Sequence, residues 1–364
     1  MKKRITVLLL ALLMLLPAGC GRSTGEEEAP PAENPPHQES YGPQLPEEPE
    51  PEPEPYVPAG TNPLTGEPME PEFEQNRPVA VMLNNLKAAQ PQLGISQADI
   101  VYEVPAEGGI TRMLAVYQTL DGVGELGSVR STRPYYIELA LGHEALLVHA
   151  GGSEAAYGKI SSWKVDNMDG VRGGSDAEIF WRDPERRKTK GLEHSLLTSG
   201  ENILAYLAEG HFTTAHREGW AYPQAFAEDG TPQGGEAAEH VSVRFSDYKT
   251  AVFDYDAAGG RYLAGQYGED QIDGATGDRV SAVNLLVLKA KMTVLDGEGR
   301  LSVKLTEGEG LFFCGGKSVP IRWSKEDRDS PFVYTLADGG PLVLGRGKSY
   351  VCLINEKSGR VSVS

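Results

Sequence analysis

Long apolar runs, positive charge and the common catalytic motifs are all scarce in this sequence, and each scarcity excludes a class of protein. The most apolar stretch, residues 5–16, is shorter than the roughly 20 residues that a membrane-spanning helix needs. Lys and Arg number 34 against 52 Asp and Glu, so the formal net charge is -18 and nucleic acid is not an expected partner. Because there is also no P-loop, GxSxG elbow, Rossmann glycine pattern or metal-ligand spacing, we expect no cofactor and no metal.

Residues 1–20 have the pattern of a bacterial lipoprotein signal. A basic start is followed by the apolar stretch, and small residues then precede Cys20. This resembles a lipobox, in which the cysteine is acylated and becomes the mature N-terminus, although Pro17 stands where Leu is usual. We therefore predict lipidation of Cys20 and a lipid-anchored location on the extracytoplasmic face of the bacterial cell membrane. The alternative is plain secretion, with a cysteine that happens to follow the signal.

Residues 21–60 are predicted to be a disordered tether. They contain 11 of the 25 Pro residues, ten Glu and one Arg. Such a segment has too little apolar surface to form a core, and alternating Pro and Glu favour extended polyproline II. The segment is expected to hold the folded part of the chain away from the membrane.

The rest of the chain is long enough for two domains, and its pattern predicts an α+β fold. In residues 61–219, β-like segments alternate with helices that begin near Pro134 and after a capping box of Thr198 and Glu201. This alternation predicts a layered α/β sandwich with a mixed sheet. Residues 220–240 have a linker composition, and residues 241–364 consist of short strands typical of a smaller, β-rich antiparallel domain. Cys314 and Cys352 lie in two of these strands, and either a disulfide or two buried thiols would fit.

A first polar cluster surrounds the turn at residues 105–109. It contains Glu103, Glu107 and Arg112. Two carboxylates near an arginine could act as general acid and base on a glycan, or could hydrogen-bond to sugar hydroxyls. A salt-bridged hairpin tip would have the same composition.

A second cluster precedes the helix at Pro134 and contains Arg130 and Arg133. Two guanidinium groups beside free N–H groups at a helix start would suit a carboxylate or a phosphate. The alternative is that the arginines balance the acidic charge of the domain.

Two histidines also lie at positions where sites are common. His149 ends an apolar strand and precedes the Gly-rich turn at residues 150–153, and His194 follows the basic stretch at residues 182–190. A structural, hydrogen-bonded histidine is the alternative at both positions.

Several long strings in this sequence together resemble one family, the YerB-like lipoproteins. The strings are RPVAVMLNN, QADIVYEVPAEGGITRMLAVY, VRSTRPYYIELA, VHAGGS, IRWSK and PLVLGRGKSYVCLI. The resemblance covers nearly everything from Asn62 to the C-terminus. It implies an exported, membrane-tethered protein with an N-terminal α/β sandwich and a smaller β-rich part, and it implies no catalytic residues.

Two functional hypotheses follow. In the first, a non-catalytic envelope lipoprotein binds a cell-wall component or an envelope protein through an N-terminal cleft. In the second, a hydrolase or transferase acts on envelope glycan or phosphodiester, with Glu103 or Glu107 as acid and base and the Arg130–Arg133 pair holding an anionic group. The predicted ligand-binding residues are Glu103, Glu107, Arg112, Arg130, Arg133, His149 and His194.

Overall fold

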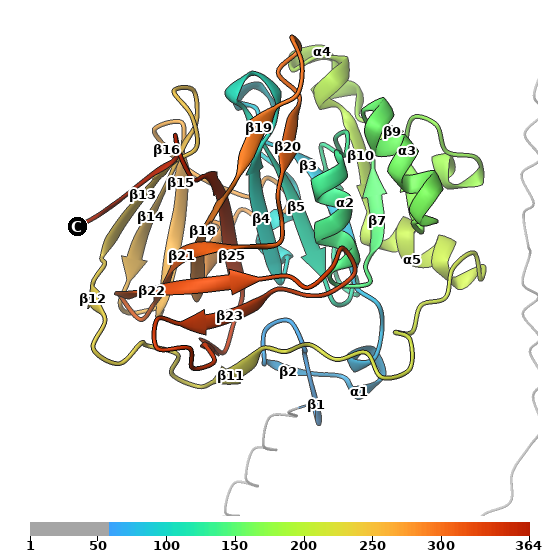
Figure 1. Ribbon diagram of the computed structural model, residues 1–364. Helices are drawn as coiled ribbons and strands as arrows, with labels where there is room; N and C mark the ends of the chain where they lie inside the picture. The colour runs from blue at the N-terminus through green and yellow to red at the C-terminus, as the bar shows by residue number, and fades with distance from the viewer. Residues whose placement is uncertain (1–57) are drawn as a thin grey trace, which may run out of the picture. The chain divides into compact units, whose positions relative to one another are not determined.

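The largest sheet of the protein is assembled from both halves of the chain. The computed structural model describes residues 58–364, so the predictions made for residues 1–57, including the signal, Cys20 and most of the tether, lie outside the described residues. Figure 1 shows the strands of this sheet side by side. Its ten consecutive strands are β12 (Glu236–Ala237), β22 (Lys317–Ser324), β21 (Glu307–Cys314), β18 (Asn284–Ala290), β25 (Ser349–Asn355), β4 (Ile100–Pro105), β5 (Thr111–Tyr117), β3 (Val79–Asn84), β7 (Leu146–His149) and β8 (Asn167–Asp169), and β23 (Val333–Leu336) pairs with β22.

The pairing in this central sheet is mixed, as the sequence predicts. β4, β5 and β3 form antiparallel pairs, whereas β3, β7 and β8 run parallel to one another. The two halves of the chain meet where β25 pairs in parallel with β4. Because parallel strands are covered on both faces, their side chains are almost continuously apolar, and all six residues of β3 are buried.

A second sheet is formed by the C-terminal half alone, and its pairing is antiparallel throughout. It packs against one face of the central sheet, where Val241, Phe253 and Tyr262 join the same core as Val101 and Tyr350. Its strands are β16 (Glu269–Asp270), β15 (Arg261–Gln266), β14 (Thr250–Asp256), β13 (His240–Arg244), β26 (Arg360–Val363) and β17 (Ser281–Ala282).

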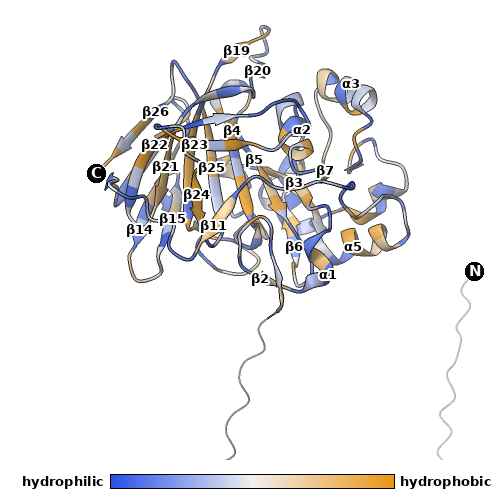
Figure 2. Cartoon of the chain, turned by 60° about the horizontal axis from the view of Figure 1, so that its bottom comes forward, coloured by the Kyte–Doolittle hydropathy of each residue, from blue (hydrophilic) through white to orange (hydrophobic). Residues whose placement is uncertain are grey.

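Helices cover the two faces of the central sheet. The face that carries Met82 and Leu114 packs against α2 (Pro134–Leu141) and α3 (Glu154–Trp163), and the opposite face receives Ile203 of α5 (Gly200–Ala208). Figure 2 shows that the strands between these layers are largely hydrophobic. The predicted α+β fold, with a layered N-terminal part and a smaller antiparallel C-terminal sheet, is confirmed.

The predicted cap of the last of these helices is wrong by one residue. The Ser199 side chain accepts the capping hydrogen bond from the backbone N–H of Asn202. Thr198 belongs to the preceding strand, and its hydroxyl donates to the carbonyl of Ile179 instead. Both residues belong to β10, but Ser199 is the last residue of that strand and directly precedes α5, so its hydroxyl reaches the N–H of Asn202.

Shorter elements complete the chain. Two of them, β11 (Ala225–Ala227) and β12, lie within residues 220–240 and pair with the strands β24 and β22 of the C-terminal half. The domain boundary drawn there from composition stays a prediction. The other short elements are β1 (Gly60–Thr61), β2 (Pro68–Met69), α1 (Pro71–Glu74), β6 (Glu125–Gly127), β9 (Trp181–Arg182), α4 (Pro184–Thr189), β10 (Leu196–Ser199), β19 (Met292–Val294), β20 (Leu301–Val303) and β24 (Val343–Gly345). Within residues 58–364, no helix has the length and apolar character needed to cross a bilayer.

Cys314 and Cys352 are buried free thiols. Their side chains belong to the cores on opposite faces of the central sheet, so the sheet itself lies between them. This arrangement favours the thiol alternative over the disulfide.

His143 is a buried titratable group in the core beneath α2. Its Nε2 lies 2.8 Å from the hydroxyl of Tyr102, and its Nδ1 has no partner among the described residues. Burial, reinforced by the positive charges of Lys325 and His216, lowers the pKa of His143 from 6.5 to about 3. The folded protein therefore holds His143 neutral at pH values where the unfolded chain is protonated.

This difference predicts a loss of stability in mild acid. Between pH 7 and pH 5 the unfolded state takes up a proton at His143 that the folded state does not, which lowers the free energy of unfolding by about 2 kcal/mol. Asp99, whose burial raises its pKa to about 6, acts in the opposite direction. Urea unfolding of the wild type and of the His143→Gln variant at several pH values would measure the contribution of His143 to the free energy of unfolding. Asp99 is present in both proteins, so its effect cancels in the comparison. Equal pH slopes in the two proteins would contradict the prediction.

Candidate functional site

A pocket of about 310 Å³ opens beyond the carboxyl ends of the parallel strands β7 and β8. In sheets with parallel strands, ligands commonly bind at this edge, because the loops that follow the strands converge there. Its walls come from the loop before α2, the loop between β7 and α3, the loop after β8, and the segment that includes β9 and β10. We call it the arginine pocket, after Arg130, Arg172 and Arg182, which line it.

The floor of the arginine pocket is the Gly-rich turn between β7 and α3. Gly151 has a positive φ of 77°, and its N–H donates to Oδ1 of Asp169 at 2.8 Å. Ser153 caps α3 by accepting a hydrogen bond from the N–H of Ala156. A strand, a glycine turn and a helix start in this order form a common backbone arrangement for holding an anion.

His149 holds this turn in position from the protein interior. Its side chain is buried, with Nδ1 2.8 Å from the carbonyl oxygen of Gly151 and Nε2 3.0 Å from Oδ1 of Asn167. Because both ring nitrogens have protein partners, His149 holds the turn in position, and it is not one of the residues that line the pocket.

The three arginines use little of their hydrogen-bonding capacity. Arg130 donates to Glu193 at 2.9 Å, Arg172 donates to Glu154 at 2.8 Å, and Arg182 donates to the carbonyl of Leu192 at 2.7 Å. A guanidinium group has five N–H donors, so most of these arginine donors have no acceptor within residues 58–364. The Nε of Arg130 is buried and has no acceptor among the described residues.

The rim of the arginine pocket is partly apolar. Val171 is 60% exposed and Leu192 is 53% exposed, and both line the pocket. Inside it, the ring of Tyr157 lies 3.8 Å from the guanidinium carbon of Arg172, and its hydroxyl donates to Asp169 at 2.8 Å. The tyrosine therefore orients Arg172 by a cation–π contact.

His194 lies beside the arginine pocket, behind Arg130. Its Nδ1 is 2.9 Å from Nδ2 of Asn84, so it accepts that hydrogen bond. Burial, together with the charge of Arg130, lowers the pKa of His194. The imidazole is consequently neutral at pH 7 and supports the neighbouring side chains without adding charge.

Glu107, Arg112 and Arg133 form a separate ionic network at the β4–β5 turn. Arg133 donates to one carboxylate oxygen of Glu107, and a guanidinium nitrogen of Arg112 lies 3.4 Å from the other. Burial alone would raise the pKa of Glu107, but the hydrogen bond and charge of Arg133 and the charge of Arg112 hold it below its usual value. Arg112 also donates to the carbonyl of Ser131 at 3.0 Å, which braces the loop that carries Arg130.

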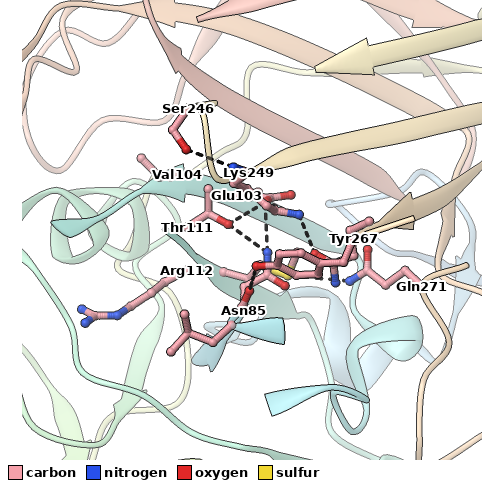
Figure 3. Close-up of polar contacts among 12 residues, drawn as sticks. Asn85, Glu103, Val104, Thr111, Arg112, Ser246, Lys249, Tyr267 and Gln271 are labelled. Atoms are coloured by element: carbon pink, nitrogen blue, oxygen red, sulfur yellow. Dashed lines mark hydrogen bonds and ion pairs between the residues drawn. The ribbon is translucent and has the colours of Figure 1, made fainter. Parts of the chain in front are cut away.

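Glu103 lies on the opposite face of the sheet, in the core between the two sheets. Figure 3 shows its side chain enclosed by polar partners from several strands. Its carboxylate forms an ion pair with Lys249 at 3.1 Å, and neither side chain is exposed. Three further donors complete its shell: Thr111 at 2.6 Å, Asn85 at 3.0 Å and Tyr350 at 2.7 Å.

Lys249 is equally well satisfied. It donates to Oε1 of Gln266 at 2.5 Å and lies 5.0 Å from the centre of the Tyr267 ring. Its ammonium group therefore has three partners: the carboxylate of Glu103, the side-chain oxygen of Gln266 and the ring of Tyr267. The buried pair therefore connects β4 to β14 and β15 of the second sheet, and water has no access to either charge.

The structure thus divides the predicted site residues into three groups. Arg130 lines the arginine pocket, with His149 and His194 behind its walls. The network of Glu107, Arg112 and Arg133 supports the loop next to the pocket, and Glu103 lies apart in the core. Arg172, Arg182 and Tyr157 also line the pocket and were not predicted from the sequence. Arg182 begins the basic stretch that was noted, whereas Arg172 and Tyr157 showed no local pattern.

The described residues contain no group of three or more His, Cys, Asp or Glu side chains that could hold a metal ion. The guanidinium groups of Arg130, Arg172 and Arg182 in the arginine pocket are suited to recognition of negative charge.

Comparison with known proteins agrees with this architecture. Residues 64–213 match the N-terminal domain, and residues 241–351 the C-terminal domain, of a protein of unknown function called DUF3048. The two matches cover more than half of the chain, which therefore belongs to the DUF3048 family. The chain is 30% identical over 299 residues to YerB of Bacillus subtilis (strain 168), whose name marks it as a candidate lipoprotein, and the match spans 80% of this chain and 85% of YerB. The crystal structure of YerB matches with a TM-score of 0.71 and 28% identity, covering 83% of this chain and 99% of that one.

The enclosure of the Glu103–Lys249 pair predicts a large energetic coupling. Glu103→Gln or Lys249→Met alone leaves a buried charge without its partner and should lower the free energy of unfolding by about 3 to 5 kcal/mol. The double variant removes both charges and should be less destabilised than the sum of the two single variants, which urea unfolding of all four proteins would measure. Glu228→Gln, which removes an exposed partner of Arg346, is the matched control and should leave the unfolding midpoint unchanged. Additive effects of the two buried substitutions would contradict the coupling.

Proposed function

We propose that this protein is a non-catalytic, lipid-anchored envelope protein that binds an anionic component of the cell wall in the arginine pocket. The component would present a phosphate or a carboxylate to the guanidinium groups. An envelope protein with an exposed acidic group is the other partner that the same chemistry would accept, and it is distinguished by the binding test below.

The observation that carries the proposal is the set of unused arginine donors around one pocket. The chain has a net charge of -18, yet Arg130, Arg172 and Arg182 all line the same pocket of about 310 Å³. Two of them are paired only with the exposed carboxylates of Glu193 and Glu154, whose side chains are 67% and 80% exposed. Such exposed pairs are weak, so a ligand anion could replace these carboxylates at little cost.

The enzymatic alternative gains no support from the geometry. A general acid must hold a proton near neutral pH and reach the substrate. Glu107 has a lowered pKa because of Arg133 and Arg112, and Glu103 is enclosed in the core on the other face of the sheet. These two carboxylates consequently do not face a shared substrate position, and the arginine pocket is lined by a single carboxylate, Glu193, which is paired with Arg130.

Two independent features support the proposed lipid-anchored location in the cell envelope. Residues 1–20 resemble a lipoprotein signal that ends at Cys20, and the Bacillus subtilis relative has a lipoprotein name. A lipid anchor followed by a Pro-rich and Glu-rich tether would present the folded part to wall polymers outside the membrane.

Substitution of the pocket arginines tests the binding proposal. Each charge-assisted hydrogen bond contributes roughly 1.5 to 3 kcal/mol, so Arg130→Gln or Arg182→Gln should weaken binding of solubilised wall fragments roughly tenfold or more. Calorimetric titration of the detergent-solubilised full-length protein would measure this. Arg261→Gln, an exposed arginine in the second sheet, should bind like the wild type. If the wild-type protein binds purified envelope proteins but no wall fragment, the partner is an envelope protein and not a wall component.

Loss of the anchoring cysteine tests the location. Cys20→Ala removes the thiol that would carry the lipid, so the protein should move from the membrane fraction to the medium and lose incorporation of labelled palmitate. The wild type, expressed in the same cells, is the control. A Cys20→Ala protein that stays in the membrane fraction would show that the chain is retained in another way.

A further inference from the structure

We infer that the ligand of the arginine pocket is a linear anionic polymer with one phosphate per repeat, and that this polymer continues from the pocket across α4. The inference rests on the proposed function of the pocket. It adds the chemical class of the ligand and the course that the ligand takes over the surface.

The first supporting observation is a pair of unpartnered cations on α4. Arg187 and Lys188 are exposed, and the side chain of neither forms a hydrogen bond or an ion pair with any residue in the described range 58–364. Acidic side chains outnumber basic ones by 52 to 34 in this chain, so carboxylate partners are abundant elsewhere. Two adjacent free cations on one short helix are therefore available to an external anion.

A second observation is that α4 is fixed firmly to the rest of the molecule. Arg186 is buried and donates to three backbone carbonyls, those of Ala89 at 2.6 Å, His194 at 3.0 Å and Pro91 at 3.1 Å. Lys190 donates to the carbonyl of Gln90 at 2.5 Å. These bonds hold the helix, so its exposed cations keep a constant position relative to the arginine pocket.

The third observation is that α4 adjoins the wall of the arginine pocket. The 3₁₀ turn at Leu192–His194 packs against α4, and it contributes Leu192 and Glu193 to the pocket wall. His194 in this turn is joined to α4, because its backbone carbonyl accepts a hydrogen bond from Arg186 at 3.0 Å. Figure 1 shows α4 beside β9 and β10, on the side of the molecule that carries α3.

Ligand size decides between a polymer and a compact anion. A single phosphate or a peptide carboxylate would occupy the arginine pocket alone, and it would not respond to Arg187 or Lys188. A polymer with regularly spaced charges would contact the pocket and α4 at once, and the second contact would add affinity because it is already tethered by the first. The exposed position of the α4 cations also predicts that this added affinity decreases as salt concentration rises.

The test compares one repeat with many on the same protein. Calorimetric titration of the detergent-solubilised full-length protein would use glycerol 3-phosphate and poly(glycerol phosphate) of defined length, at equal phosphate concentrations. We expect the polymer to bind about tenfold more tightly per phosphate than the monomer. The Arg187→Gln/Lys188→Gln protein should lose this gain and keep its affinity for glycerol 3-phosphate. Arg261→Gln/Lys289→Gln removes the same charge from exposed strand positions and should keep both affinities.

The possible outcomes separate this inference from the proposed function. Equal binding of monomer and polymer by the wild type would overturn the polymer inference and leave the pocket intact. A second result to consider is that the polymer still binds more tightly than the monomer to the Arg187→Gln/Lys188→Gln protein, or that the control variant loses the difference equally. Either result would overturn the inference that the polymer contacts α4. Absence of binding for both probes would overturn the phosphate specificity of the pocket, and the inference with it.

Discussion

The buried pair of Glu103 and Lys249 is the constraint on which the arrangement of the two sheets depends. Moving two charges out of water costs several kcal/mol each, and the cost is offset only where every donor and acceptor is satisfied. Here the carboxylate has four partners and the ammonium has three, and these come from both sheets. A shift of one sheet relative to the other would break several of these contacts at once. The pair therefore selects one packing of the second sheet, beyond what apolar contacts alone would specify.

The position of β25 extends this constraint to the pocket. β25 comes from the end of the chain and lies between β18 and β4, so the N-terminal strands complete their sheet only when the C-terminal half is present. Tyr350 of β25 also donates to Glu103. The strand that joins the two halves thus takes part in the buried network, and through β4, β5 and β3 it supports the parallel strands whose ends form the arginine pocket.

Local sequence patterns were sufficient to predict the helix at Pro134 and the α+β class. They could not predict which residues meet, because that depends on pairings between distant segments such as β4 and β25. Glu103 and Glu107 illustrate this limit. They are four residues apart and looked like a carboxylate pair, but Glu103 points into the core between the sheets while Glu107 lies in the turn with Arg133. Arg172 could not be predicted as a pocket residue for the same reason, since only the fold brings it to the same pocket as Arg130.

The arginines of this protein differ in how completely the protein satisfies them, and this difference separates support from recognition. Arginine cannot lose its charge, so a buried guanidinium group must find acceptors within the chain. Arg186 does so with three backbone carbonyls and thereby anchors α4. Arg130, Arg172 and Arg182 each donate one side-chain hydrogen bond to another described residue at the wall of an open pocket, where water can reach most of their other donors. A ligand oxygen that replaces such water gains a charged donor without breaking the fold, which is why the incompletely satisfied arginines, and not the buried ionic networks, mark the surface suited to binding.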